Sequence, residues 1–218
     1  QIYGDFCGYS TIAIGIAKIL GFQLMTNFAT PYFATSPQDF WRRWHISLST
    51  FFRDYLYIPL GGSRTTPLKA DRNAIVTFTV SGLWHGANWT FIVWGFYHGV
   101  LLVLQRRLQA LRIAHLPSWL TTLPSMGLTF VLVCIGWVLF RAQSMSAALD
   151  YYHGILTRFG LPQEHRLAMV YVLLAVGIDY VWKNDTRMET VGIPGLRARP
   201  ELLLRWASYV VLFWMVVI

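Results

Sequence analysis

Residues 74–104, with the sequence AIVTFTVSGLWHGANWTFIVWGFYHGVLLVL, form a run of 31 positions without a Lys, Arg, Asp or Glu residue. A helix needs about 20 such residues to cross the hydrocarbon core of a bilayer, so one helix leaves part of the run unused. Basic residues flank the run on both sides, and such residues favour the cytoplasmic face. The sequence therefore predicts two short helices that cross and return, with a turn at Gly86-Ala87-Asn88 and His85 beside it.

The composition is that of a membrane protein. Of the 218 residues, 55% are hydrophobic and 13% are charged, whereas an average soluble domain has about 25% charged residues. The net charge is +8, but Lys and Arg lie in short clusters between apolar runs, as in membrane-protein loops rather than nucleic-acid-binding domains. The two cysteines and six histidines match no disulfide or metal-site spacing. We expect an all-α, polytopic transmembrane bundle without nucleic-acid or metal binding.

Further apolar runs complete this interpretation. They predict spans at 2–25, 122–140, 167–182 and from Trp206 onward. The basic loops at 63–73, 105–112 and 183–205 are expected to face the cytoplasm, and the loop at 141–166 the opposite side. In the first run, Asp5 either caps a helix or lies at an interface, or it faces a polar cavity. Because the chain starts without Met and ends inside an apolar run, residues 1–218 are expected to be one membrane domain, a C-terminal fragment of a longer protein.

Residues 36–49, with the sequence SPQDFWRRWHISLS, predict the start of a helix. Ser36 suits the N-cap, Pro37 the first helical position, and Asp39 the positive end of the helix dipole. If the helix continues to about Gly61, its aromatic side chains share one face and its cations another, with His45 at the edge. This segment is too charged to span, so an interfacial or re-entrant amphipathic helix is predicted.

His85 and His45 are the candidate catalytic residues, because an ionisable group in an apolar segment is a candidate functional site. Burial favours the neutral imidazole, which can take the proton of a hydroxyl group. The structural alternative for His85 is a histidine that bonds a backbone carbonyl inside a bundle, and for His45 an interfacial role. The chain has no hydrolase, P-loop or dinucleotide motif.

Three stretches of this sequence resemble the membrane-bound O-acyltransferase (MBOAT) family. They are Asp39 to Ser49 followed by Phe52 to Gly62, Gly82 to Asn88, and the opening Gln1 to Ser10. The likeness is greatest to the bacterial branch that contains alginate O-acetylation and D-alanyl transfer proteins. The resemblance implies a helical bundle around a central tunnel, with His85 as the catalytic histidine and His45 as a second functional polar residue.

The resemblance also implies a function. We expect a multi-pass protein of the bacterial inner membrane. It would be an acyltransferase (EC 2.3.1.-) that moves an acyl group, acetyl in the first instance, from a cytoplasmic thioester toward an exported polysaccharide such as alginate. The donor would be acetyl-CoA or an acyl carrier, with no bound cofactor. An SGNH-type acyl-relay protein outside the membrane, the polysaccharide machinery and membrane lipid are the expected partners.

Other residues are expected to serve this site. Those expected to line the tunnel or touch the substrate are Trp84, Asn88, Trp44 and Asp39. Those expected to meet an anionic donor are Arg42, Arg43 and Arg53, for which binding to lipid headgroups is the alternative. Two other functions stay open: D-alanyl transfer to a cell-wall polymer, and a non-catalytic transporter whose histidines relay protons.

Overall fold

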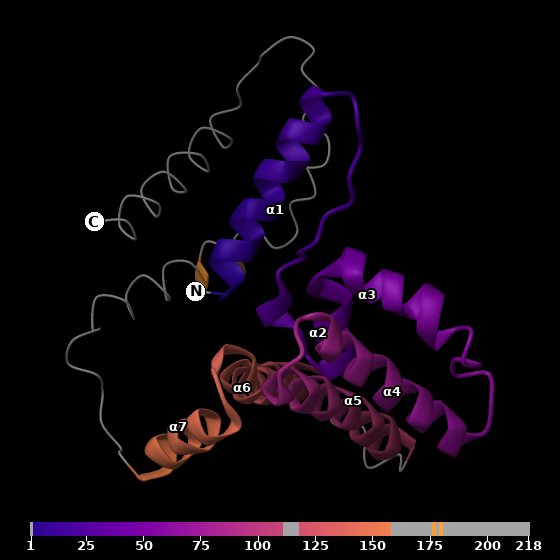
Figure 1. Cartoon of the computed structure of the whole chain (residues 1–218), viewed down its shortest axis with the longest axis vertical. Helices are drawn as coiled ribbons and strands as arrows, with labels where there is room; N and C mark the ends of the chain where they lie inside the picture. Colours follow the sequence, from indigo (N-terminus) through magenta and orange to yellow (C-terminus); the bar gives the residue numbers. More distant parts are fainter. Residues whose placement is uncertain (1, 111–117, 158–175, 178, 181–218) are drawn as a thin grey trace. The chain divides into compact units, whose positions relative to one another are not determined.

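The computed structural model describes residues 2–110, 118–157, 176–177 and 179–180 (Figure 1). By its contacts the chain divides into two compact units, Gln1–Arg158 and Phe159–Ile218. The described part is helical without a named strand, which confirms the all-α prediction. The elements are α1 (Ile2–Ile19), a 3₁₀ turn (Pro31–Phe33), α2 (Pro37–Arg43), α3 (Ile46–Phe52), a π-helical turn (Arg53–Tyr57), α4 (Pro67–Trp84), α5 (Trp89–Ala110), α6 (Ser118–Arg141) and α7 (Met145–Thr157).

The helices α4 and α5 form the predicted hairpin, with a turn between Trp84 and Trp89. Glycines let the two backbones touch: a Cβ atom at Gly82 would overlap the carbonyl oxygen of Phe91, and one at Gly95 would overlap that of Phe78. Small residues at such spacing are typical of close helix packing in membranes. Glycine at these two positions therefore allows the backbones of α4 and α5 to pack closely.

The hairpin is longer than predicted, and the expected loops at 63–73 and 105–112 are wrong over most of their length. α4 begins at Pro67 and α5 continues to Ala110. The carboxylate of Asp71 is buried and accepts hydrogen bonds from Arg106 (Nη1–Oδ1 2.9 Å) and Arg107 (Nε–Oδ2 2.9 Å). These ion pairs join the two helices beyond the apolar run, which a loop prediction based on charge alone does not foresee.

The single amphipathic helix predicted from Ser36 onward starts as expected but is broken at Trp44 and His45. Ser36 Oγ accepts a hydrogen bond from the Asp39 N–H at 3.2 Å, which confirms the N-cap. Trp44 is then extended (φ −108°, ψ 127°) and His45 is left-handed (φ 45°, ψ 55°). The segment before α2 causes this break: the Ala29 N–H donates to the Arg43 carbonyl (2.9 Å) and the Ile46 N–H to that of Asn27 (3.1 Å).

The predicted span at 122–140 coincides with a helix of suitable length and composition. Within the described residues one helix, Thr121–Arg141, is long and apolar enough to cross a membrane. The predicted loop at 141–166 is wrong where α7 forms, capped by Ser144 Oγ, which accepts a hydrogen bond from the Ala147 N–H (3.2 Å). The predictions for residues 167–182, 183–205 and 206 onward lie outside the described residues, apart from helical positions 176–177 and 179–180. Several spans, a tunnel and a single domain stay predictions.

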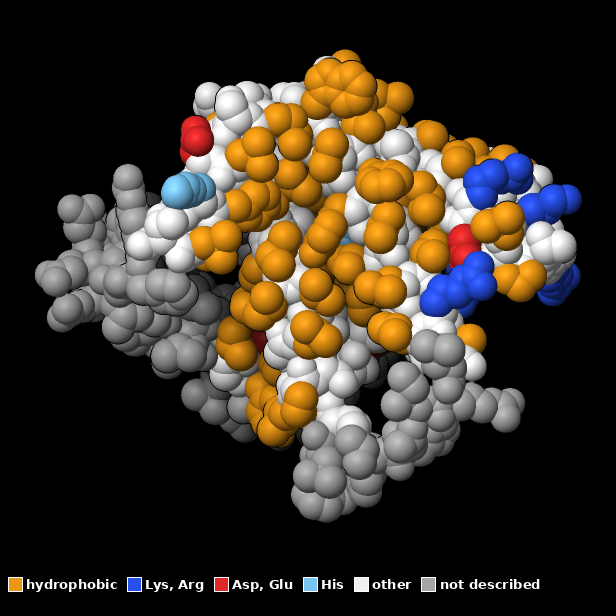
Figure 2. All heavy atoms as spheres, turned by 90° about the horizontal axis from the view of Figure 1, so that it is seen from below, with side chains coloured by type: hydrophobic (Ala, Val, Ile, Leu, Met, Phe, Trp, Pro, Cys, Tyr) orange, Lys and Arg blue, Asp and Glu red, His pale blue; other side chains and the backbone are white. Residues whose placement is uncertain are grey.

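Aromatic side chains make the core that positions the site. Trp44 is 4% exposed and packs against Phe40 (ring centroids 5.6 Å apart), Phe28 (4.9 Å) and Trp137 of α6 (4.7 Å). The surface is also apolar: Figure 2 shows hydrophobic side chains over much of one face. Such extended apolar surface is typical of a protein that contacts lipid or further protein.

We expect Trp44→Ala to destabilise the fold strongly. Truncation of a buried tryptophan typically costs about 3–5 kcal/mol, because packing is lost and a cavity remains. Phe51→Ala is the matched control, since Phe51 lies on α3 and is 52% exposed; such surface changes stay within about 0.5 kcal/mol. Thermal unfolding in detergent measures both. Equal melting of Trp44→Ala and wild type would show that this aromatic cluster does not hold α2 in place.

Candidate active site

A cavity of about 390 Å³ brings His45 and His85 together, although they lie 40 positions apart in the sequence. Four parts of the chain meet around it: α1, the α2–α3 junction, the α4–α5 hairpin and α6. The lining residues are Ile2, Asp5, Phe6, Tyr9, Trp41, Trp44, His45, Leu48, His85, Trp94, Trp137 and Phe140. The wall is thus aromatic and aliphatic, with two imidazoles and one carboxylate as its titratable groups besides Tyr9.

His85 directly follows the last residue of α4, and its backbone N–H donates to the Gly82 carbonyl at 3.0 Å. Its half-buried ring makes edge contacts with Trp94 (centroids 5.4 Å apart) and Phe140 (5.0 Å). Within the described residues no side-chain hydrogen bond of His85 to a backbone carbonyl is found, and aromatic edges contact its ring. The catalytic role of His85 and its structural alternative both stay predictions.

His45 is held in an unusual backbone conformation. A left-handed φ of 45° is strained for a residue other than glycine, and such strain concentrates at functional sites. Asn27, 20 positions earlier in the sequence, stabilises this conformation, because its Oδ1 accepts hydrogen bonds from Ser47 N–H (3.2 Å) and Ser47 Oγ–H (2.6 Å). The ring of His45 packs edge-on against Phe6 (4.6 Å), and its Nδ1 is buried without a partner among the described residues.

The electrostatics of the cavity favour a neutral imidazole at His45. This residue lies at the α2–α3 junction, outside the membrane-crossing candidate. Burial lowers its pKa to about 4, and the positive charge of His85 acts in the same direction. His45 is therefore neutral near pH 7 and can accept a hydrogen bond or a proton at one ring nitrogen. Because each charge disfavours the other, the two imidazoles do not become cationic together.

Two tryptophans give the cavity wall unused hydrogen-bond donors. The indole N–H groups of Trp41 and Trp94 are buried and lack a partner in the described part of the chain. Trp94 is only 2% exposed, and both residues line the cavity. A buried donor that stays unpaired costs about 1–3 kcal/mol, so an acceptor atom that reached these indole groups would be favoured.

The residues predicted to line a tunnel divide into two groups. Trp44 lines the cavity. Trp84 touches the ring of His85 (5.1 Å) but is 60% exposed and is not part of the lining. Asp39 also lies outside the lining: its carboxylate accepts hydrogen bonds from Arg43 Nε (2.8 Å) and the Thr35 N–H (3.1 Å), which fixes the start of α2.

Asn88 has a structural position in the hairpin turn. Its Oδ1 accepts a hydrogen bond from the Thr90 N–H (3.1 Å), and its Nδ2 donates to the Gln143 carbonyl (3.0 Å). The first bond caps α5, and the second ties the turn to the α6–α7 connection. Asn88 therefore positions the segment that carries His85 instead of lining the cavity.

The three predicted donor-side arginines do not line the cavity either. Arg43 pairs with Asp39 (2.8 Å) and Arg53 with its neighbour Asp54 (2.7 Å). Arg42 is exposed and makes no ion pair within the described residues. These side chains lie on the surface of α2 and of the π-helical turn, where either an anionic ligand or lipid headgroups can reach Arg42.

Sequence reasoning missed several residues of the cavity. Asp5, in the first turn of α1, was not among them: a cavity-facing position was one of its alternatives, although the cavity that it lines is mainly apolar. Trp94 and Trp137 carried no local signal, because their place depends on how α5 and α6 pack. His98 is 2% exposed between Trp41 (5.0 Å) and Trp94 (5.1 Å), so it supports the aromatic wall from behind.

Comparison with known proteins gives one family. The model of the membrane-bound O-acyltransferase family (MBOAT) matches residues 1–146. A probable alginate O-acetylase AlgI of Azotobacter vinelandii is 51% identical over 152 residues, which are 70% of this chain and 30% of the relative. A peptidoglycan O-acetyltransferase of Helicobacter pylori is 45% identical over 168 residues (76% and 31%).

A more distant relative is a D-alanyltransferase rather than an O-acetylating protein. A teichoic acid D-alanyltransferase of Bacillus subtilis is 33% identical over 153 residues, 65% of this chain and 38% of the relative. The chain thus spans about a third of the length of the curated relatives it matches. The histidines and the cavity lie within the matched range.

Proposed function

The chain belongs to the membrane-bound O-acyltransferase family, and on this premise we propose that it carries the catalytic histidines of a membrane-embedded O-acyltransferase. The group transferred is acetyl, the donor is a thioester, and the acyl group moves toward an exported polysaccharide by way of a hydroxyl acceptor. The names of the O-acetylating relatives support the acetyl group and the carbohydrate acceptor. The observation that carries the proposal is the cavity shared by His45 and His85.

The proposed reaction begins at His85. Its neutral ring takes the proton of the acceptor hydroxyl while the oxygen attacks the carbonyl carbon of the thioester. A carbon–oxygen bond forms, the carbon–sulfur bond breaks, and the leaving thiolate takes up the proton that His85 received. An apolar wall suits this step because it excludes water, which would otherwise hydrolyse the thioester.

In this proposal His45 and the indole N–H groups hold the acyl thioester. We assign His45 the orientation of the acyl group, since the residue lines the cavity, its backbone conformation is fixed, and its Nδ1 has no partner among the described residues. The N–H groups of Trp41 and Trp94 are suited to a carbonyl oxygen that gains negative charge during attack. These roles require the acyl donor and the acceptor to reach the cavity from opposite sides. The tunnel implied by the resemblance to the family would allow this.

The cellular arrangement follows the same proposal. The donor, acetyl-CoA or an acyl carrier, loads from the cytoplasm, no cofactor stays bound, and the protein crosses the bacterial inner membrane several times. An SGNH-type relay protein and polysaccharide machinery receive the acyl group outside. Among the basic residues, Arg42 is the better contact for an anionic donor, because Arg43 and Arg53 are paired with carboxylates.

A second candidate is D-alanyl transfer to a cell-wall polymer, which the teichoic acid D-alanyltransferase relative supports. The chemistry at His85 would be the same, because a D-alanyl thioester and an acetyl thioester present the same carbonyl group. The difference lies in the donor and the acceptor.

The test uses the full-length protein in membrane vesicles with acyl-labelled thioester on the cytoplasmic side. We expect label in an ester on exported polysaccharide with the acetyl thioester, and little with the D-alanyl carrier. The opposite preference would replace the first candidate by the second. Uptake of a solute that follows pH, without any labelled ester, would instead identify a proton-linked transporter and end the acyltransferase proposal.

A further inference from the structure

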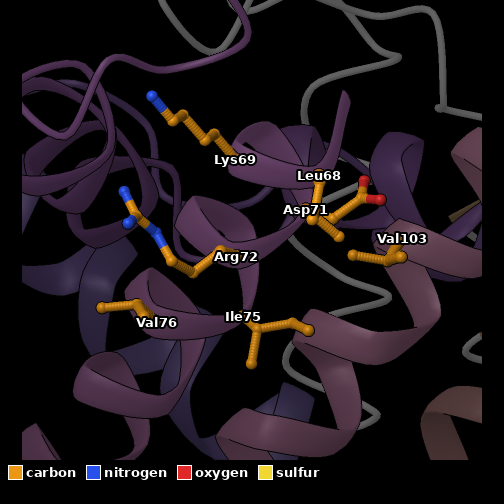
Figure 3. Close-up of a pocket in the computed structure, with 7 residues that line it drawn as sticks. All are labelled: Leu68, Lys69, Asp71, Arg72, Ile75, Val76 and Val103. Carbon is orange, nitrogen blue, oxygen red and sulfur yellow. The ribbon is translucent and has the colours of Figure 1, made fainter. Parts of the chain in front are cut away.

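A second cavity lies on the outer face of the α4–α5 hairpin, at the end away from His85. Its volume is about 630 Å³, and its lining combines aliphatic with charged side chains: Leu68, Lys69, Asp71, Arg72, Ile75, Val76 and Val103 (Figure 3). None of these residues lines the cavity of the two histidines. We name this second cavity the hairpin groove.

One end of the hairpin groove carries excess positive charge. Two cations, Lys69 and Arg72, line the groove together with a single carboxylate, that of Asp71, whose charge is paired with Arg106 and Arg107 of α5. Arg72 donates to the neutral amide oxygen of Asn73 (3.0 Å), so its charge is not compensated, and Lys69 has no ion pair in the described part of the chain. A group of Lys and Arg side chains around an acidic one is visible at one end of the face in Figure 2.

The polarity of the hairpin groove changes along α4. Lys69 and Arg72 lie one turn apart, and Ile75 and Val76 follow on the next turn; Val103 of α5 lies on the side of Ile75 and Asp71, and Val76 on the side of Arg72 (Figure 3). Lys69 and Val76 are separated by roughly 10 Å along the helix axis, at about 1.5 Å per residue. The first turn of α4 contains no acidic residue, so the positive end of the helix dipole adds to the basic end.

We propose that the hairpin groove binds one anionic phospholipid, with the phosphate at Lys69 and Arg72 and an acyl chain along Ile75, Val76 and Val103. Charge complementarity argues for a phosphate, and basic pockets between membrane helices bind such headgroups. The aliphatic end of the groove favours a lipid over free phosphate or coenzyme A, because only a lipid has an acyl chain that gains binding energy from burial there. The site lies apart from the two histidines, so it does not depend on the proposed acyl transfer.

The binding test uses the full-length protein, purified in neutral detergent, with phosphatidylglycerol as the probe and phosphatidylcholine as the uncharged comparison. We expect native mass spectrometry to show one retained phosphatidylglycerol and thermal unfolding to shift upward on its addition. In the double variant Lys69→Gln/Arg72→Gln, affinity should fall about tenfold or more, since each cation near an anionic lipid contributes about 1 kcal/mol. Arg141→Gln, at the exposed end of α6, should bind like wild type.

A second variant tests the aliphatic half and keeps the charges. Val103→Trp fills the groove beside α5 and should reduce phosphatidylglycerol binding without weakening any contact with inorganic phosphate. Competition by coenzyme A or inorganic phosphate at the same concentration as the lipid would assign the cations to a soluble anion and overturn the proposal. Equal binding of phosphatidylcholine, or unchanged binding by both folded variants, would overturn it as well.

Discussion

Gly95→Ala is expected to force α4 and α5 apart and to destabilise the whole hairpin. The new Cβ atom would overlap the carbonyl oxygen of Phe78, which is backbone and cannot turn away as a flexible side chain would. Overpacking of this kind typically costs about 1–3 kcal/mol, and sometimes more. Gly82→Ala should act in the same way, because its Cβ atom would overlap the carbonyl oxygen of Phe91.

Gly127→Ala provides the control, because it introduces the same methyl group into α6, where no atom lies within 4 Å of the Cβ position. Alanine favours a helix over glycine by about 1 kcal/mol, so this variant should unfold at or above the wild-type temperature. Thermal unfolding of the full-length protein in detergent compares the variants. If Gly95→Ala and Gly127→Ala unfold alike, the backbones of α4 and α5 are not in contact as described.

The hairpin was predictable because the features that produce it lie within one short stretch of sequence. The 31-residue run between two basic flanks is too long for one span, and Gly86-Ala87-Asn88 marks the turn. Its true ends were not predictable from charge, because the pairing of Asp71 with Arg106 and Arg107 joins residues about 35 positions apart. These ion pairs join helical residues in both of the expected loops.

The site was only partly predictable, for a related reason. His45 and His85 stood out as ionisable residues in apolar surroundings, but periodicity placed His45 on a continuous helix. The break depends on Asn27, whose bonds to Ser47 come from a segment 20 positions earlier, and no helical pattern records them. Trp94 and Trp137 likewise enter the wall only after α5 and α6 have packed together.

His85→Ala is expected to have the largest effect on activity. General-base catalysis contributes typically about 10²–10⁴-fold, so acyl transfer by the full-length protein should fall by at least that range. Expression, membrane insertion and melting should stay close to normal, because the side chain has no hydrogen bond to lose among the described residues. His153→Gln, on the exposed surface of α7, is the control that should keep wild-type activity.

His85→Gln separates a catalytic from a structural role. Glutamine has a similar reach and can hydrogen-bond, but it cannot take a proton from a hydroxyl group at neutral pH. A role in hydrogen bonding would therefore be rescued, whereas proton transfer would not. His45→Gln should be milder, since we assign His45 to the orientation of the donor.

The most direct test of the account is the rate of labelled acyl transfer from thioester to polysaccharide by full-length His85→Gln, measured beside wild type at equal amounts of folded protein. The account predicts a loss of at least about 10²-fold with an unchanged melting temperature. Near-normal transfer by His85→Gln would contradict it, and His85 would then be a structural residue of the hairpin turn.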